Sequence, residues 1–246
     1  GIPIFASVAD AVREAGVNTS FIIVPAAFAA NAILEAAEGG VSFIVCVTEH
    51  IPMHDQARVY NILKRYYPSI RLLGPNCAGI ISPGEKVNIG FNPPSVSMPG
   101  NVGIVSRSGT LAYQSTYELT RKGIGQSSVV GIGGDPVPGT SFIDCLEAFE
   151  ADPETKGVIL IGEIGGTAEE EAADYIKANM TKPVVAYIAG VTAPPGRKMG
   201  HAGAITSGNR GTAAAKISAL QSAGALVAHN PTELGDLMEQ ALNSKK

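Results

Sequence analysis

The chain has 246 residues, of which 45% are hydrophobic and 16% are charged, with 29 glycines and 16 prolines. This composition is typical of a compact globular protein rather than a disordered one, and the length is sufficient for two domains. The net charge of −4, without a block of lysines and arginines, argues against a nucleic-acid partner, and no apolar run approaches the roughly 20 residues of a membrane-spanning helix.

In the first part of the chain, short apolar runs alternate with helical patterns, which is typical of βαβ units around a parallel sheet. We predict helices at 8–15, 28–37 and 54–66 and strands at 20–24, 42–47 and 70–73. Ser7 is expected to cap the first helix, with Asp10 three residues on. The residues before it resemble a strand entering a helix, so we expect the chain to begin inside a domain. Ligands bind beyond the carboxyl ends of parallel strands, so the loops at 25–26, 48–50 and 74–77 should line one crevice.

Residues 81–100 hold several prolines and glycines, and we predict a linker or a loop-rich crossing there. A new series of elements follows it. We predict strands at 102–106, 127–132, 157–161, 183–188 and 225–228, and helices at 110–122, 141–151, 168–179, 211–223 and 231–243. These elements suffice for a complete doubly wound α/β domain.

The cysteines and paired histidines give little indication of a metal site. Cys46, Cys77 and Cys145 are odd in number and lack ligand spacing, which favours a reducing compartment over disulfides or structural zinc. His50 and His54 are four residues apart, but a proline intervenes and no second ligand pair is evident, so we expect no metal there. Cys77 could expose a reactive thiol, although packing against a ligand is the interpretation we favour.

His201 is the residue on which we place the chemistry. It lies between Gly200 and Gly203, and such small neighbours leave an imidazole open to a reactant. A ring with an ordinary pKa near ~6.5 is largely neutral at cell pH, so one nitrogen can attack a phosphoryl group and later release it. The alternative is a structural loop histidine.

Glu163 stands at the end of an apolar strand, where parallel sheets present catalytic carboxylates. We expect it to bind one nitrogen of His201 and so direct the other toward a phosphoryl group; the alternative is an acid that only opposes a helix dipole. Gly131-Ile132-Gly133-Gly134-Asp135-Pro136 ends another strand, and its glycines fit either a close backbone approach or a simple tight turn.

Ser108-Gly109-Thr110 closes one strand and opens a helix. The first amides of a helix form a natural anion site, so phosphate binding is expected, although serine and threonine also cap helices for structural reasons. The chain has no Walker A motif, so a nucleotide site in this chain is not indicated.

Five ordered motifs together resemble those of succinyl-CoA synthetase α subunits: Gly74-Pro75-Asn76-Cys77, the run from Gly103 to Leu111, Gly131 to Pro136, Gly162-Glu163-Ile164-Gly165-Gly166, and Gly200-His201-Ala202-Gly203-Ala204. The resemblance implies a Rossmann-like CoA-binding domain over 1–95, without its first strand-helix unit, and a flavodoxin-like domain over 96–246.

The same resemblance implies roles for individual residues. His201 matches the phosphorylated histidine, Glu163 the glutamate that orients it, and Ser108, Gly109 and Thr110 the helix terminus that holds phosphate. Tyr113 falls where a substrate-contacting tyrosine is expected. The residues matching the CoA loops are Pro25, Val47, Thr48, Glu49, Asn76 and Cys77.

It further implies a succinate–CoA ligase reaction of the tricarboxylic acid cycle, run with an ATP-grasp β subunit that holds Mg²⁺ with ATP or GTP, in an αβ or α2β2 assembly. Its location would be the cytoplasm of a bacterium or archaeon, or the mitochondrial matrix of a eukaryote. Departures at Thr48-Glu49-His50, Cys77-Ala78-Gly79 and Leu111-Ala112-Tyr113-Gln114 leave open a malate- or citrate-CoA ligase subunit. A non-catalytic CoA-sensing module is the other alternative.

Overall fold

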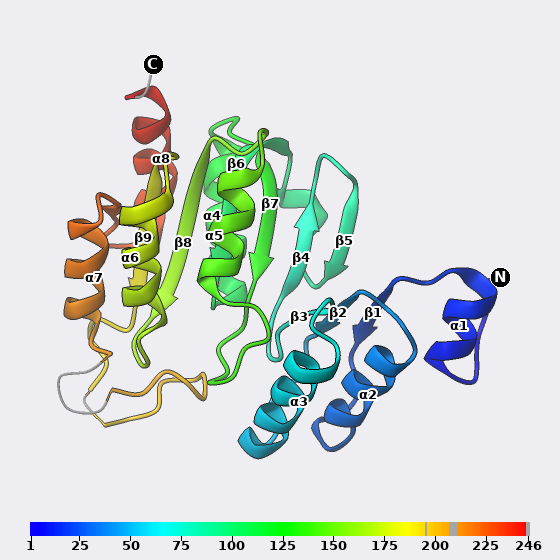
Figure 1. Cartoon of the computed structure of the whole chain (residues 1–246). Helices are drawn as coiled ribbons and strands as arrows, with labels where there is room; N and C mark the ends of the chain where they lie inside the picture. The colour runs from blue at the N-terminus through cyan, green and yellow to red at the C-terminus, as the bar shows by residue number, and fades with distance from the viewer. Residues whose placement is uncertain (195, 207–210, 245–246) are drawn as a thin grey trace.

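The computed structural model describes residues 1–194, 196–206 and 211–244, and its strands form two separate sheets (Figure 1). Pro195, in the predicted loop before His201, lies outside the described residues. The first sheet is parallel, in the order β1-β2-β3. Its elements are α1 (Val8–Ala15), β1 (Thr19–Ile22), α2 (Ala26–Glu38), β2 (Phe43–Cys46), α3 (Met53–Tyr66) and β3 (Arg71–Leu73). All six predicted elements are therefore present, with small shifts at their ends.

Local sequence explains how these first elements begin and pack. The Ser7 hydroxyl accepts a hydrogen bond from the Asp10 amide at 3.1 Å, as predicted, and α1 ends at Gly16 in the left-handed conformation. Ala29, Ile33 and Ala36 recur at helical spacing and are buried in one core cluster with strand residues such as Ile44. The β-strands of this small sheet are thus covered by the apolar face of α2.

The second sheet has seven strands in the order β10-β9-β8-β6-β7-β4-β5. Its parallel strands are β6 (Pro99–Ser106), β7 (Gln126–Gly131), β8 (Gly157–Glu163), β9 (Val184–Ala189) and β10 (Leu226–Val227). Counted along the chain, these strands lie in the order 2-1-3-4-5, which is the predicted flavodoxin-like arrangement. The helices between them are α4 (Gly109–Arg121), α5 (Phe142–Ala151), α6 (Ala168–Asn179) and α7 (Ala213–Ser222), and α8 (Leu234–Asn243) follows β10.

Helices cover both faces of this sheet (Figure 1). Val105 and Leu160 belong to a core cluster with residues of α5, α6 and α7, whereas Ile104 and Ile161 pack with residues of α4 and α8. Successive strand residues point to opposite faces, so one apolar run can supply both cores. The domain is therefore doubly wound. Among the described residues, none of the helices is both long enough and apolar enough to cross a membrane.

The expected linker over 81–100 is wrong in part, because much of it forms a β-hairpin. β4 (Gly79–Ser82) and β5 (Val87–Gly90) pair antiparallel, and β4 extends the second sheet beside β7. A short 3-10 helix, η1 (Pro94–Val96), follows. The prolines lie in the turn, after β5, or at the first residue of β6, positions that a sheet tolerates. They mark strand ends, and residues assigned to the first domain therefore pair with the second sheet.

The carboxyl ends of β6 and β8 lie side by side in register, with Ser106 opposite Ile161. The chain leaves β6 toward β7 on one side and returns as β8 on the other, so this is the topological switch point where ligands bind in open α/β sheets. Two hydrogen bonds to Asp135, from Gln56 of α3 at 2.8 Å and from Asn76 at 2.9 Å, connect a helix and a loop of the first sheet to this edge of the second.

Candidate active site

His201 and Glu163 are in direct contact at the switch point. Nδ1 of His201 lies 2.7 Å from Oε2 of Glu163, the last residue of β8. Glu163 is buried and His201 is partly exposed, so the carboxylate lies behind the ring. The contact engages Nδ1 and leaves Nε2 as the ring nitrogen that a reactant can approach. This is the hydrogen bond expected from the sequence.

The pKa of His201 is raised above its usual value. The hydrogen bond that the ring donates to Glu163 is the main cause, and the negative charges of Glu163 and Asp135 act in the same direction. Burial of the ring and the positive charge of Arg107 lower the pKa and offset part of this effect. The ring is therefore held in an environment that favours a positive charge on it.

The glycine-rich segments bring three loops together around His201. A Cβ atom on Gly165 would lie 2.0 Å from the carbonyl oxygen of Gly203, and Gly203 donates a backbone hydrogen bond to Gly134 at 3.1 Å. Gly133 adopts a φ of 91°, and a Cβ atom there would lie 2.3 Å from the carbonyl oxygen of Pro75. Two uses were considered for the glycines of the Gly131–Pro136 segment, and the structure has the first of them, a close approach of backbone segments.

A cavity of about 510 Å³ opens beside His201, and the first residues of α4 line it. The Ser108 hydroxyl caps this helix by accepting from the Leu111 amide at 3.3 Å. Gly109 and Thr110 follow, and the first amides of a helix have no acceptor within it. These amides and the helix dipole favour an anion at this end of the cavity. Tyr113, one turn further on, lines the same cavity.

Three of the six residues predicted to contact CoA line this cavity as well, namely Glu49, Asn76 and Cys77. Pro25, Val47 and Thr48 do not. Pro25 precedes the first turn of α2, and Val47 is buried. The Thr48 hydroxyl donates to the Val24 carbonyl at 2.7 Å, while its own carbonyl accepts from the Asn76 amide at 3.0 Å. These contacts hold the three loops beside one another, although the loop at 25–26 does not reach this cavity.

The thiol of Cys77 is poorly suited to covalent chemistry. Burial raises its pKa to about 12, and its sulfur lies 3.4 Å from the Cys46 carbonyl. A thiol with so high a pKa is almost wholly protonated near neutral pH, and only the thiolate is a nucleophile. Packing is therefore the role that its surroundings favour.

Several residues of the site were not predicted. Arg107 is buried, lines the cavity and lies between Glu163 and Glu169. In the sequence it stands in the Ser106-Arg107-Ser108 turn, where nothing distinguishes it from a surface arginine. Phe91 and Asn92 line the cavity from the segment expected to be a linker. Lys216 is fully buried and was not predicted either. Spacing alone carries no signal for partners so distant in sequence.

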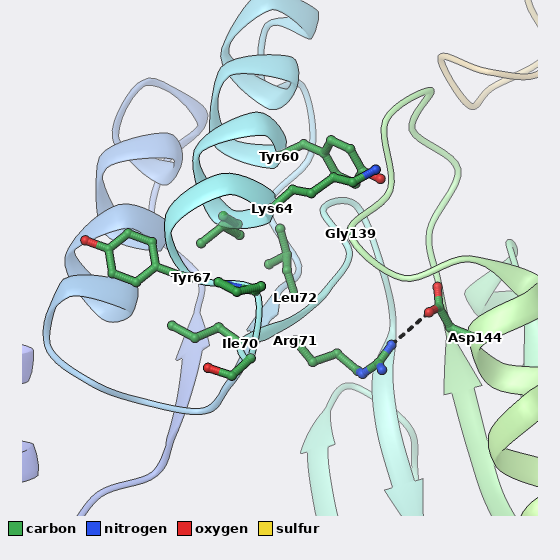
Figure 2. Close-up of a pocket in the computed structure, with 11 residues that line it drawn as sticks. Tyr60, Lys64, Tyr67, Ile70, Arg71, Leu72, Gly139 and Asp144 are labelled. Carbon is green, nitrogen blue, oxygen red and sulfur yellow. Dashed lines mark hydrogen bonds and ion pairs between the residues drawn. The ribbon is translucent and has the colours of Figure 1, made fainter.

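A separate cavity of about 300 Å³ lies between the end of α3 and the loop before α5 (Figure 2). Arg71, at the start of β3, and Asp144, in α5, both line it and form an ion pair of 3.1 Å (Figure 2). Lys64 lies 5.8 Å from the ring centroid of Tyr60. This second cavity shares no lining residue with the cavity beside His201, and none of the predicted site residues lines it.

Comparisons with known protein families cover both parts of the chain. The CoA-ligase family matches residues 105–226, and the CoA binding domain family matches residues 1–50. Among solved structures, ATP citrate lyase of Methanosaeta concilii in complex with (3S)-citryl-CoA superposes with a TM-score of 0.89 at 25% identity. That match covers 100% of this chain and 42% of the lyase, so the chain spans less than half of that protein.

A dinucleotide-forming acetyl-coenzyme A synthetase of Candidatus Korarchaeum cryptofilum superposes with a TM-score of 0.75 at 24% identity. The match covers 99% of this chain and 50% of the synthetase, and at this identity it supports the fold alone. Curated relatives are more similar in sequence. The ADP-forming succinate–CoA ligase α subunit of Aquifex aeolicus is 53% identical over 98% of this chain and 79% of its own length. Subunit alpha 2 of Archaeoglobus fulgidus is 56% identical, with 98% and 83% covered. On this similarity, the chain belongs to the family of succinate–CoA ligase α subunits.

Proposed function

We propose that the chain is the α subunit of a nucleoside-diphosphate-forming succinate–CoA ligase in which His201 carries the phosphoryl group. The observation that carries the proposal is the 2.7 Å contact between His201 and Glu163 beside a cavity lined by the start of α4. A nucleophilic ring nitrogen, a carboxylate that orients it and an anion-binding helix terminus are the parts that phosphoryl transfer through histidine requires.

In the proposed reaction, phosphate displaces CoA from succinyl-CoA to give succinyl phosphate. Nε2 of His201 attacks the phosphorus atom, the P–N bond forms, and the bond to the succinate oxygen breaks with the electron pair leaving on the carboxylate. The phosphoryl group then passes from Nε2 to a nucleoside diphosphate. Glu163 accepts the hydrogen bond from Nδ1–H throughout and stabilises the positive charge that develops on the ring.

The amides of Gly109 and Thr110 would bind the phosphoryl oxygens, with Ser108 holding the helix start and Tyr113 placed toward the acid. CoA is supported as a ligand by the match to CoA-binding and CoA-ligase families. We assign it to the loops of Pro25, Val47, Thr48, Glu49, Asn76 and Cys77. In the proposed division, residues 1–95 form the CoA-binding domain and 96–246 the ligase domain, and the hairpin of β4 and β5 from the first part extends the sheet of the second.

The name of the relatives as subunits supports a partner chain. We propose an ATP-grasp β subunit that holds the nucleotide with Mg²⁺, in an αβ or α2β2 complex, and a cytoplasmic location if the source is bacterial or archaeal. The curated names favour succinate over malate or citrate, and they favour a working ligase over a CoA-sensing module.

The test is phosphorylation of the purified protein with its partner by labelled Mg-ATP or Mg-GTP, followed by intact mass. We expect one acid-labile, base-stable phosphate on the chain, absent from His201→Asn and retained in a control, His229→Asn, whose histidine is exposed and lies after β10, two strands away from β8. Its release by succinate with CoA, but not by malate or citrate, supports the substrate. Labelled His201→Asn would refute the assignment.

A further inference from the structure

Behind His201, four charged residues of alternating sign form a row, and the proposed reaction uses only the outermost of them. In order inward they are Glu163, Arg107, Glu169 and Lys216. The side chains of Glu163 and Arg107 are each 9% exposed, and those of Glu169 and Lys216 are fully buried. Burying unpaired charges is costly, so a row of this kind persists only if each member has partners.

The inner pair is fixed by backbone as well as by charge. Lys216 Nζ binds Glu169 Oε2 and donates to the Gly165 carbonyl at 2.6 Å. Glu169 Oε1 accepts from the backbone amide of Glu163 at 3.0 Å. A Cβ atom at Gly162 would lie 2.5 Å from Cγ of Glu169, so this glutamate packs directly on the end of β8. The pair is therefore built into the strand that presents Glu163.

Arg107 connects the buried pair to the site. One of its terminal nitrogens lies 3.5 Å from Glu169 Oε1, and its Nε lies 3.5 Å from Glu163 Oε1. The Arg107 amide donates to the Ile161 carbonyl at 3.0 Å, which fixes its backbone beside β8. A planar guanidinium can contact two carboxylates at a set separation, which a lysine ammonium cannot do equally well.

The two carboxylate oxygens of Glu163 have different surroundings. Oε2 contacts His201, whereas Oε1 is buried and has no hydrogen-bond partner among the described residues. Among the described residues, the ion pair that Oε1 makes is with Nε of Arg107. If Arg107 were absent, the carboxylate could rotate or turn aside without losing another contact at that oxygen.

We infer that Arg107, held by the buried Glu169–Lys216 pair, is a positioning residue that orients the Glu163 carboxylate toward Nδ1 of His201. Its importance for phosphoryl transfer rests on the proposed function, but its effect on the Glu163–His201 contact does not. The alternative is a charge-only role, in which Arg107 neutralises the buried carboxylates and contributes nothing to their orientation.

The experiment is a histidine ring titration by NMR on the purified protein, with the His201 signal assigned by its loss in His201→Asn. The charged groups that act on this ring are Glu163, Arg107 and Asp135. Removing the positive charge of Arg107 would by itself raise the pKa of His201. A positioning role predicts the opposite, because loss of the Glu163 hydrogen bond lowers that pKa. Arg107→Gln should therefore lower it toward the value in Glu163→Gln.

Arg107→Lys serves as the second variant, in case Arg107→Gln does not fold. It retains the charge, so a charge-only role predicts an unchanged pKa for His201, whereas positioning predicts a value between wild type and Arg107→Gln. Arg71→Gln, which breaks the exposed pair with Asp144, is the matched control and should leave the titration unchanged. A raised or unaltered pKa in Arg107→Gln, or an unaltered one in Arg107→Lys, overturns the inference.

The proposed function is tested separately in the same variants through the rate of phosphorylation by Mg-nucleotide. Residues that hydrogen-bond to metal ligands typically contribute roughly 10- to 100-fold to activity, and by analogy Arg107→Gln should lower this rate by that factor, with partial recovery in Arg107→Lys. The titration requires no phosphoryl transfer. A lowered pKa in a chain that never acquires phosphate would therefore refute the proposed function and still support the positioning role.

Discussion

The imidazole of His201 lies against Gly134, in the space that a side chain at that position would need. A Cβ atom on Gly134 would be 2.1 Å from both Cγ and Nδ1 of the ring. The neighbouring backbone cannot retreat freely, because Gly203 donates a hydrogen bond to the Gly134 carbonyl. Glycine at this position therefore allows the ring to reach Glu163.

Gly134→Ala should displace the ring and break its contact with Glu163. A misplacement of about 1 Å commonly costs on the order of 100-fold in rate, so phosphorylation of His201 should slow by about that factor. The measurement is the single-turnover rate of phosphate incorporation from Mg-nucleotide. Gly84→Ala is the control, because nothing lies within 4 Å of a Cβ atom there, and its rate should equal that of wild type. Equal rates for both variants would contradict the steric argument.

Lys216→Met should destabilise the fold, because it leaves the fully buried Glu169 without its main cation. Breaking a buried ion pair from one side typically costs about 3–5 kcal/mol in the free energy of unfolding. Urea denaturation measures the loss. The double variant Lys216→Met/Glu169→Gln should recover part of it, since residue 169 then carries no buried charge. Lys122→Met, which removes surface ion pairs with Asp236 and Glu239, should shift the midpoint little. A single variant as stable as wild type would show that the pair contributes nothing.

The buried thiols should resist alkylation in the folded protein. Burial raises the pKa of Cys77 and of Cys145 to about 12, so little thiolate exists at pH 8. Mass spectrometry after brief treatment with iodoacetamide should find these cysteines unmodified, and full modification once urea unfolds the chain. Rapid alkylation of Cys77 in the folded protein would instead indicate an open, activated thiol at the cavity.

The elements were predictable from sequence wherever one local rule dominated. The buried strand 157–161 and the helix 168–179 follow from continuous apolar and helical patterns, and the structure places β8 and α6 there with at most small changes. The hairpin of β4 and β5 was missed because its prolines and glycines signal loops locally, while pairing with β7 decides its conformation. Tertiary pairing of this kind leaves no mark on a short window.

The same distinction applies to the site. Glycines around His201 and an acid at the end of an apolar strand are local signals, and both residues were found from them. Lys216 lies on a helix among alanines, where a lysine is ordinarily solvent-exposed, and its partner Glu169 is 47 residues away. The burial of that pair depends on α6 packing against α7 at the end of β8, which spacing along the chain cannot express.

The pH dependence of phosphorylation should reflect the raised pKa of His201. Only the neutral ring is a nucleophile, so the rate should rise with pH and reach half its plateau above pH ~6.5, the value of an unperturbed histidine. Glu163 is the largest cause of the raised pKa, whereas burial opposes it. Glu163→Gln should therefore move the midpoint to lower pH while reducing the plateau rate by about 100-fold or more, because the ring loses its orienting carboxylate.

The same shift predicts the direction of a stability effect. A group whose pKa is higher in the folded state stabilises that state fully below its unfolded pKa, and this contribution is lost as the pH rises through the folded value. Urea unfolding from pH 5 to pH 9 should thus show the wild-type advantage over Glu163→Gln shrinking as His201 deprotonates. His201→Asn provides the baseline without that titration. If the difference in urea midpoint between wild type and Glu163→Gln were the same at every pH, the carboxylate would not bind the protonated ring preferentially. The 2.7 Å contact would then have no electrostatic consequence.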